Sequence, residues 1–145
     1  MLWTKMPTIE AIQHSLKNTL CEQLGMKFTE VGDDFLIAQM PVDHRTHQPA
    51  GLLHGGASVA LAESLGSIAS FLCIPSPDQM PVGVEINANH LRSVTEGFVY
   101  GKVTAIKVGR TLHVWNIEIK NDADQLVCVS RLSVMIVPRP TGKTS

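Results

Sequence analysis

The sequence predicts an α+β fold in which one curved antiparallel sheet wraps around one long central helix. Three features of the 145-residue chain support it: a run of apolar and small residues at 51–73, a strand hairpin before that run, and four extended stretches after it. A helix and a sheet can each bury one face against the other, so this order favours a single domain. We expect the domain to span residues 1–137 and residues 138–145 to form a loose C-terminal tail.

The central run is predicted to be helical because it contains no proline and its large apolar residues recur along one side. These residues are Leu61, Leu65, Ile68 and Leu72. Counting in steps of three and four residues from Glu63 gives a second face of small side chains: Gly56, Val59, Ala60, Gly66, Ser67 and Ser70. Small side chains let another backbone or a ligand come close, so we expect a second helix or a substrate to cover this face.

Changes of periodicity predict the remaining elements. Residues 8–24 carry apolar side chains at helical spacing between Pro7 and Gly25, which indicates one amphipathic helix. Residues 26–31 and 35–42 are predicted to form two strands around the turn at 32–34. Four more strands are predicted at 82–91, 98–108, 111–120 and 126–137, and short turns between them favour an antiparallel meander.

Composition narrows the function class. With 44% hydrophobic residues and a net charge of −1, the chain can bury a core and has no basic excess for nucleic acid. The start has no apolar signal-peptide region, and the central run is rich in Ser and Gly, so we expect a cytoplasmic protein that does not associate with membranes. Cys21, Cys73 and Cys128 are far apart among apolar neighbours, which suits reduced core thiols.

Glu63 is the only formal charge between Arg45 and Asp78. A carboxylate is seldom buried without a partner, because desolvation disfavours its charged form. An isolated Glu in an apolar helix is therefore a catalytic candidate. The alternative is a structural ion pair with an Arg or Lys from elsewhere in the chain.

The segment Gln48-Pro-Ala-Gly-Leu-Leu-His54-Gly55-Gly56 forms the turn into the central helix. The first amides of a helix lack internal acceptors and lie at its positive end, so Gly55 and Gly56 can donate to a developing oxyanion. Gly55 and Glu63 are eight residues apart, about 12 Å along one helix, and cannot both touch one carbonyl. If both are catalytic, they must come from two copies of the helix packed antiparallel, which predicts a dimer with two shared sites.

No metal site is expected. His44 and His47 flank a polar loop, but no third ligand lies at a suitable spacing, so we interpret both as surface residues.

The turn at 48–56, the Ala62-Glu63-Ser64 segment, the stretch from Glu85 to Ser93 and the pair Gly109-Arg110 together resemble the hotdog-fold acyl-CoA thioesterases. The similar branch is the one with a helix glutamate, which includes the 4-hydroxybenzoyl-CoA thioesterases of the Arthrobacter type and phenylacetate-pathway thioesterases. The similarity runs from about Trp3 to Val137. Motif, spacing and element order agree, which makes it more specific than an isolated His-Gly-Gly.

The resemblance implies a role for each matching catalytic residue. Glu63 would be the base or nucleophile at the thioester carbonyl, and the Gly55 amide of the other subunit would polarise that carbonyl. Gln48 would position the attacking water or the substrate. His54 would lie near the thioester or order the turn. Ser67 would touch the water or acyl group, or simply bond its own backbone.

Two further segments match positions that meet coenzyme A in the family. They are His90, Arg92 and Ser93 at a strand end, and Gly109, Arg110 and Thr111 in a hairpin turn. Arginine suits phosphate because its planar fork makes two charge-assisted bonds. The alternative is that these cations are solvated turn residues.

The resemblance also implies a reaction and an assembly. We expect hydrolysis of an acyl-CoA thioester without any cofactor, on an aryl-CoA such as benzoyl-CoA or the 1,4-dihydroxy-2-naphthoyl-CoA of menaquinone synthesis. The expected assembly is a homo-oligomer, a dimer with shared sites arranged as a dimer of dimers. Two alternatives are an acyl-CoA-binding sensor without turnover and a hotdog dehydratase, although the latter needs a strand or loop histidine as partner to the carboxylate.

Overall fold

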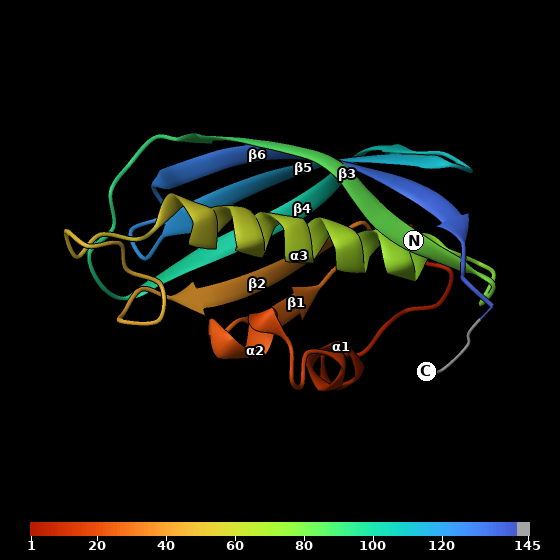
Figure 1. Ribbon diagram of the computed structural model, residues 1–145, viewed down its shortest axis with the longest axis horizontal. Helices are drawn as coiled ribbons and strands as arrows, with labels where there is room; N and C mark the ends of the chain where they lie inside the picture. The colour runs from red at the N-terminus through yellow and green to blue at the C-terminus, as the bar shows by residue number, and fades with distance from the viewer. Residues whose placement is uncertain (142–145) are drawn as a thin grey trace.

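The computed structural model describes residues 1–141, and within them three helices and six strands (Figure 1). The helices are α1 (Ile9–Ser15), α2 (Leu20–Gln23) and α3 (Gly55–Cys73). The strands are β1 (Lys27–Val31), β2 (Phe35–Pro41), β3 (Gln79–His90), β4 (Phe98–Val108), β5 (Leu112–Asn121) and β6 (Leu126–Pro138). The predicted hairpin, central helix and four later strands are confirmed. Figure 1 shows the sheet curving around α3, as the α+β hotdog prediction requires.

The strand order corrects one part of the prediction. The sheet is antiparallel with the order β1-β2-β4-β5-β6-β3, so β4, β5 and β6 form a meander but β3 does not join it next to β4. The chain crosses the concave face of the sheet through α3 before it enters β3. It therefore adds β3 outside β6, and the next strand returns to pair with β2. As a result, β3 is an edge of the sheet along its whole length.

The α3 helix packs closely against the sheet because glycines lie at the contacts. A Cβ atom added at Gly66 would lie 2.5 Å from Leu132 Cδ2, and one added at Gly101 would lie 2.5 Å from Leu65 Cδ1. Leu65 is fully buried, as predicted for the apolar side of the helix. Gly66 and Ser70, however, also face the sheet, so that part of the predicted open face is wrong. These small residues allow the sheet of the same chain to pack closely against α3.

By length and composition alone, α3 could cross a membrane, but eight of its residues are buried within the domain. This is typical of a core helix.

The predicted helix at 8–24 is interrupted. It forms α1 and the single turn α2, separated by Asn18, whose φ is 61°. The hydroxyls of Ser15 and Thr19 each donate to a carbonyl three residues earlier, which competes with continued helix. Asn adopts the left-handed conformation more readily than most residues, so the chain turns at this position. Leu20 is one of the apolar residues at helical spacing in 8–24, yet it is 58% exposed.

A buried hydrogen-bond network joins α3 to β5. Trp115 Nε1 donates to Ser70 Oγ at 2.7 Å, and Ser70 Oγ lies 3.0 Å from His113 Nδ1. Burial lowers the pKa of His113, which outweighs the opposing effect of its hydrogen bond to the Gly109 backbone. The imidazole is therefore neutral at pH 7. In this state the Ser70 hydroxyl can donate to Nδ1.

The C-terminal end of the domain is held to the loop after α3. Pro138 is the last residue of β6, and the backbone N–H of Arg139 donates to Asp78 O at 2.6 Å. Arg139 Nε donates to Pro77 O at 3.1 Å. The tail was predicted to begin at residue 138; its residues 142–145 lie outside the described part of the chain.

Candidate active site

The turn into α3 leaves one backbone donor open. His54 is the N-cap residue, and its Nδ1 accepts a hydrogen bond from Gly56 N at 2.8 Å. The N–H groups of Ala57 and Ser58 donate to the His54 carbonyl. Among residues 1–141, the Gly55 N–H has no acceptor. Because it also lies at the positive end of a 19-residue helix, the Gly55 amide can stabilise an oxyanion.

A cavity of about 360 Å³ opens at this turn. The predicted residues that line it are Gln48, Gly55, His90, Arg92 and Ser93. The contact between the last residue of β3 and the first residue of α3 is close, since a Cβ atom at Gly55 would lie 2.8 Å from His90 Nε2. The fold thus brings together two of the predicted catalytic residues and one of the two predicted coenzyme A segments.

Gln48 is ordered by its own loop. Its Oε1 accepts from the N–H of Ala50, and its backbone N–H donates to Leu52 O at 2.7 Å. Within the described residues its Nε2 group has no acceptor, so this nitrogen can donate to a ligand in the cavity.

Glu63 lies apart from that cavity, on the side of α3 that faces β3. Its side chain is half-buried, and within residues 1–141 it forms no ion pair and no hydrogen bond. A Cβ atom placed on Gly83 would lie 2.8 Å from Glu63 Oε1. A structural ion pair within one described chain is therefore excluded. The carboxylate is available to act as a base or nucleophile.

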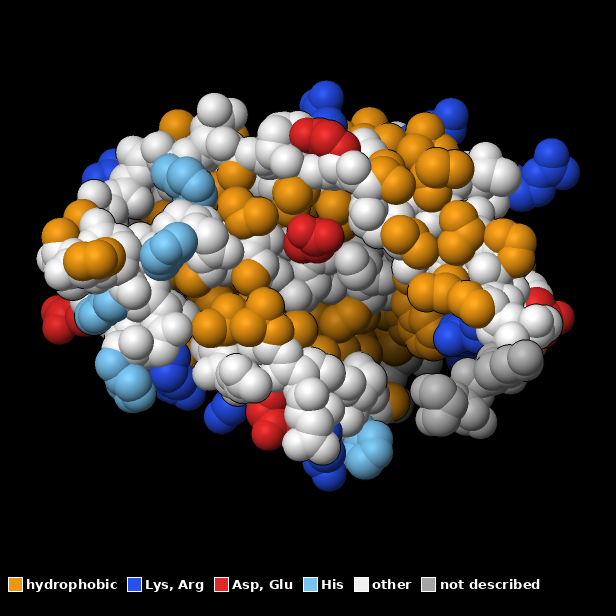
Figure 2. Space-filling model, in the orientation of Figure 1, with side chains coloured by type: hydrophobic (Ala, Val, Ile, Leu, Met, Phe, Trp, Pro, Cys, Tyr) orange, Lys and Arg blue, Asp and Glu red, His pale blue; other side chains and the backbone are white. Residues whose placement is uncertain are grey.

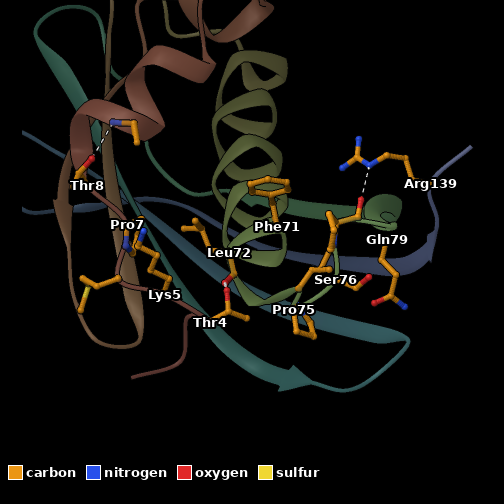
Figure 3. Close-up of a pocket in the computed structure, with 14 residues that line it drawn as sticks. Thr4, Lys5, Pro7, Thr8, Phe71, Leu72, Pro75, Ser76, Gln79 and Arg139 are labelled. Atoms are coloured by element: carbon orange, nitrogen blue, oxygen red, sulfur yellow. Dashed lines mark hydrogen bonds between the residues drawn. The ribbon is translucent and has the colours of Figure 1, made fainter. Parts of the chain in front are cut away.

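Ser67 lies one turn beyond Glu63 and lines a different cavity. This cavity, about 350 Å³, lies between α1 and α3, with Ala11, Ile12, Ile68 and Phe71 in its wall. Figure 2 shows hydrophobic side chains gathered on this face, including the floor of a hollow beside α3. A second cavity of about 530 Å³ adjoins it, with Phe71 in the wall of both, and extends to Arg139 (Figure 3).

The second coenzyme A segment lies at the other end of the sheet. Gly109, Arg110 and Thr111 form the turn between β4 and β5, where Ile136 N donates to Thr111 O. His90 pairs with Cys128 near the opposite end of β6. At about 3.3 Å per residue, roughly 25 Å separates the two segments in one chain. One chain therefore does not bring them together.

Gly83 is a close neighbour of Glu63 and is not among the residues predicted from the sequence. A glycine inside a predicted strand is a signal for a bulge or a close approach of backbone to another group. Both occur here, because the register of β3 on β6 shifts between Gly83 and Glu85. The sequence could have indicated the close approach but not which residue it would involve.

The geometry supports acyl transfer. An amide at a helix N-terminus and a carboxylate, both without a partner in residues 1–141, are the two groups needed to polarise a carbonyl and deliver a nucleophile to it. The two groups stand eight residues apart on α3, about 12 Å, so one chain carries two separate halves of such a site.

Comparison with known proteins gives one consistent result. Residues 50–128 match the family model of the thioesterase superfamily. The chain is 47% identical over 137 residues to a 1,4-dihydroxy-2-naphthoyl-CoA hydrolase of Escherichia coli, covering 94% of this chain and 100% of that protein. It is also 47% identical over 137 residues to a proofreading thioesterase of Cronobacter turicensis, covering 94% of this chain and 99% of that protein.

The fold agrees with these sequence matches. A crystal structure of a thioesterase variant from Pseudomonas aeruginosa superimposes with a TM-score of 0.94 at 48% identity, covering 96% of this chain and all of that one. The chain belongs to the thioesterase superfamily and is an acyl-CoA thioester hydrolase.

Proposed function

We propose that the protein hydrolyses acyl-CoA thioesters at sites shared between two copies, with Glu63 from one copy and the Gly55 amide from the other. The observation that carries this proposal is the pair of unused groups on α3. Within residues 1–141 the Gly55 amide has no acceptor and the Glu63 carboxylate has no partner, and the two groups are too far apart to meet within one chain. A second copy would bring its Gly55 amide to Glu63 of the first copy, and its Glu63 to the Gly55 amide of the first copy.

The free edge at β3 supports this assembly. In each chain Glu63 lies against Gly83, and Gly55 lies against His90, so α3 runs antiparallel to β3. A second β3 added antiparallel to the first would extend the sheet and place both helices on its concave face. Glu63 of one copy and the Gly55 amide of the other then come together if Gly83 lies opposite the partner's His90.

The β-bulge makes that register consistent. Gly83 pairs with Val134 and Glu85 with Ser133, so Val84 is an extra residue in β3. We count Gly83 and the extra residue Val84 as one position of the strand. A two-fold axis at Asn87 then places Ile86 opposite the partner's Ala88, and Gly83 opposite the partner's His90. Residues opposite each other in an antiparallel pair point to the same face, and all four of these residues are on the concave side or face α3.

This register brings the catalytic groups within reach of one carbonyl. Neighbouring strands lie about 4.8 Å apart, so Glu63 above Gly83 and the partner's Gly55 beside the partner's His90 would flank a single substrate. It also brings the two coenzyme A segments to the same end. The turn at 109–111 would lie about three strand spacings, roughly 15 Å, from the partner's Arg92, a span that an extended coenzyme A can bridge.

The chemistry then needs no cofactor. The thioester oxygen accepts the Gly55 N–H, and Glu63 either takes a proton from water as the water oxygen attacks the carbonyl carbon, or attacks that carbon itself. In both routes the carbon–sulfur bond breaks, and coenzyme A leaves as a thiolate that takes up a proton. In the second route water then hydrolyses the acyl anhydride formed on Glu63, which releases the free acid and restores the carboxylate. Gln48 would orient the water or substrate, His54 fixes the turn by binding the Gly56 amide, and Ser67 would contact the acyl group.

For the acyl group we propose an aryl thioester. Val59, Ala60 and Ser67 are half-buried, and Ser67 lines the apolar cavity beside Ile68, so we expect the acyl group to enter a narrow opening along this side of α3. A flat ring loses less rotamer freedom on entering such a slot than a flexible chain does. The name of the Escherichia coli relative, a 1,4-dihydroxy-2-naphthoyl-CoA hydrolase, points to the same class. We also propose a cytoplasmic location and a dimer of dimers.

Free-thiol release from purified protein tests this function. We expect kcat/KM to be higher for benzoyl-CoA or 1,4-dihydroxy-2-naphthoyl-CoA than for palmitoyl-CoA, and Glu63→Gln to lower kcat about 10³-fold or more in a folded protein. A preference for palmitoyl-CoA would contradict the aryl assignment alone. A Glu63→Gln variant within a few-fold of wild type would contradict the mechanism.

A further inference from the structure

We propose that Gly83 is a positioning residue for Glu63: the side chain that Gly83 lacks leaves the space in which the carboxylate rests. The bulge at Val84 turns this position toward α3. This inference rests on the proposed role of Glu63 in hydrolysis.

The contact itself is close. A Cβ atom on Gly83 would lie 2.8 Å from Glu63 Oε1 and 3.8 Å from Glu63 Cδ. A separation of 2.8 Å between carbon and oxygen is shorter than their van der Waals contact, so any larger residue at this position would displace the carboxylate. Within residues 1–141 Glu63 has no hydrogen bond or ion pair that would restore its position. The backbone of β3 is therefore the surface that sets where the carboxylate lies.

The bulge explains how Gly83 reaches this position. In a regular strand, residues 83 and 86 would point to opposite faces. Here Gly83 pairs with Val134 while Ile86 pairs with Leu132, with Val84 as the extra residue, 54% exposed. Gly83 and Ile86 can therefore both face α3.

Contacts with Leu132 set the distance between α3 and β3 near Gly83. Its Cδ2 atom would lie 2.5 Å from a Cβ on Gly66, and its Cδ1 atom 3.8 Å from a Cβ on Gly83. Glycines on the helix and on the strand thus face the same leucine. Both allow α3 to approach β3 closely enough for Glu63 to rest on the strand backbone.

Alanine at position 83 should move the carboxylate without unfolding the protein. The atom in its way is the end of a flexible side chain, and the φ of Gly83 lies outside the left-handed region, so alanine can adopt this backbone. A displacement of about 1 Å at a catalytic group can cost about 100-fold in rate. Substrate binding depends on other residues and should change little.

The test is a double-mutant cycle with steady-state kinetics. We expect Gly83→Ala to lower kcat about 10- to 100-fold, with KM within about 3-fold and an unchanged or slightly higher melting temperature. In the Glu63→Asp background, whose carboxylate is one methylene shorter, adding Gly83→Ala should lower kcat less than about 3-fold. Equal losses in both backgrounds, or no loss from Gly83→Ala, would overturn the inference.

Gly101→Ala provides the matched control. It adds a Cβ facing the same helix but against Leu65 Cδ1, at 2.5 Å, rather than against the carboxylate. Any loss it causes should be the same with Glu63→Asp as without it. If Gly101→Ala couples to Glu63→Asp as strongly as Gly83→Ala does, general crowding of α3 explains the result and the inference fails.

A stability cycle covers the case in which Gly83→Ala folds poorly. If the carboxylate is the obstacle, Glu63→Ala should restore the melting temperature of Gly83→Ala; failure to restore it would overturn the inference. The proposed function fails separately, if Glu63→Gln alone keeps its activity. An inactive Glu63→Gln beside a fully active Gly83→Ala would overturn only the role of Gly83.

Discussion

At the residue scale, one side-chain hydrogen bond decides which helix amide stays open as the proposed oxyanion donor. Two glycine amides begin α3, and either could serve a carbonyl. His54 Nδ1 accepts from Gly56 at 2.8 Å, which leaves the Gly55 amide as the open one. A ring nitrogen that accepts this bond carries no proton, so the cap also fixes the tautomer of His54. The histidine of the His-Gly-Gly turn therefore orders the turn in this structure.

His113 gives a prediction at the same scale. Burial lowers its pKa below the ordinary value of about 6.5, so below that pH the unfolded chain binds a proton that the folded chain resists. The free energy of unfolding should therefore fall as the pH drops from about 6.5 toward 5, by at most about 1.4 kcal/mol per pH unit from this group.

Urea unfolding of wild type and His113→Gln between pH 5 and 8 measures this contribution. The other titrating groups are common to both proteins, so the difference in slope isolates His113. Parallel pH curves for the two proteins would mean that His113 contributes nothing to the acid sensitivity of the fold.

At the element scale, period and turn residues were enough to predict the hairpin, α3 and the bounds of the later strands within a few residues. They could not predict the place of β3, because a strand's period does not state which strand it pairs with. That place depends on α3 carrying the chain across the sheet. The break at Asn18 was also missed, since one residue in the left-handed region interrupts a helix without changing the apolar spacing around it.

The proposed pairing of two β3 edges makes a prediction for these elements. With the two-fold axis at Asn87, this residue lies opposite its own copy, with Cα atoms about 4.5 to 5.5 Å apart, within the range of a disulfide. We expect Asn87→Cys to form a covalent dimer under mild oxidation, visible on a non-reducing gel and reversed by thiol. Wild type, with its three native cysteines, is the control.

Neighbouring positions refine this register. Glu85 should lie opposite the partner's Asn89, so Glu85→Cys and Asn89→Cys should cross-link with each other in a mixture but far less with themselves. Efficient self-linking of either variant, with none for Asn87→Cys, would contradict the proposed axis.

At the scale of the whole molecule, the candidate site could be predicted to the extent that its residues are close together in sequence. Glu63 stands out as a lone charge, and the turn at 48–56 contains Gln48, His54 and Gly55 together. Gly83 was not predicted, because a glycine inside a strand signals a bulge or a close approach but not the register of β3 that brings it to Glu63. The spacing of Gly55 and Glu63 predicted the need for a second copy, and the structure keeps them apart on one helix.

The central claim is that each active site takes Glu63 from one copy and Gly55 from the other. Gly55→Pro removes the proposed donor, and proline suits this place because Gly55 is the first helical residue and His54 before it has an extended backbone, with φ −68° and ψ 128°. Gly55→Ala is the control, since it adds the same Cβ beside His90 but keeps the N–H.

The decisive measurement is the activity of a heterodimer that combines a Glu63→Ala subunit with a Gly55→Pro subunit. The two subunits carry different affinity tags, and the heterodimer is isolated by sequential purification. Each homodimer should be inactive, whereas the heterodimer has one site with both groups intact and should recover about half of the wild-type kcat per dimer. A folded heterodimer as inactive as its parents, with Gly55→Ala still active, would contradict the shared site.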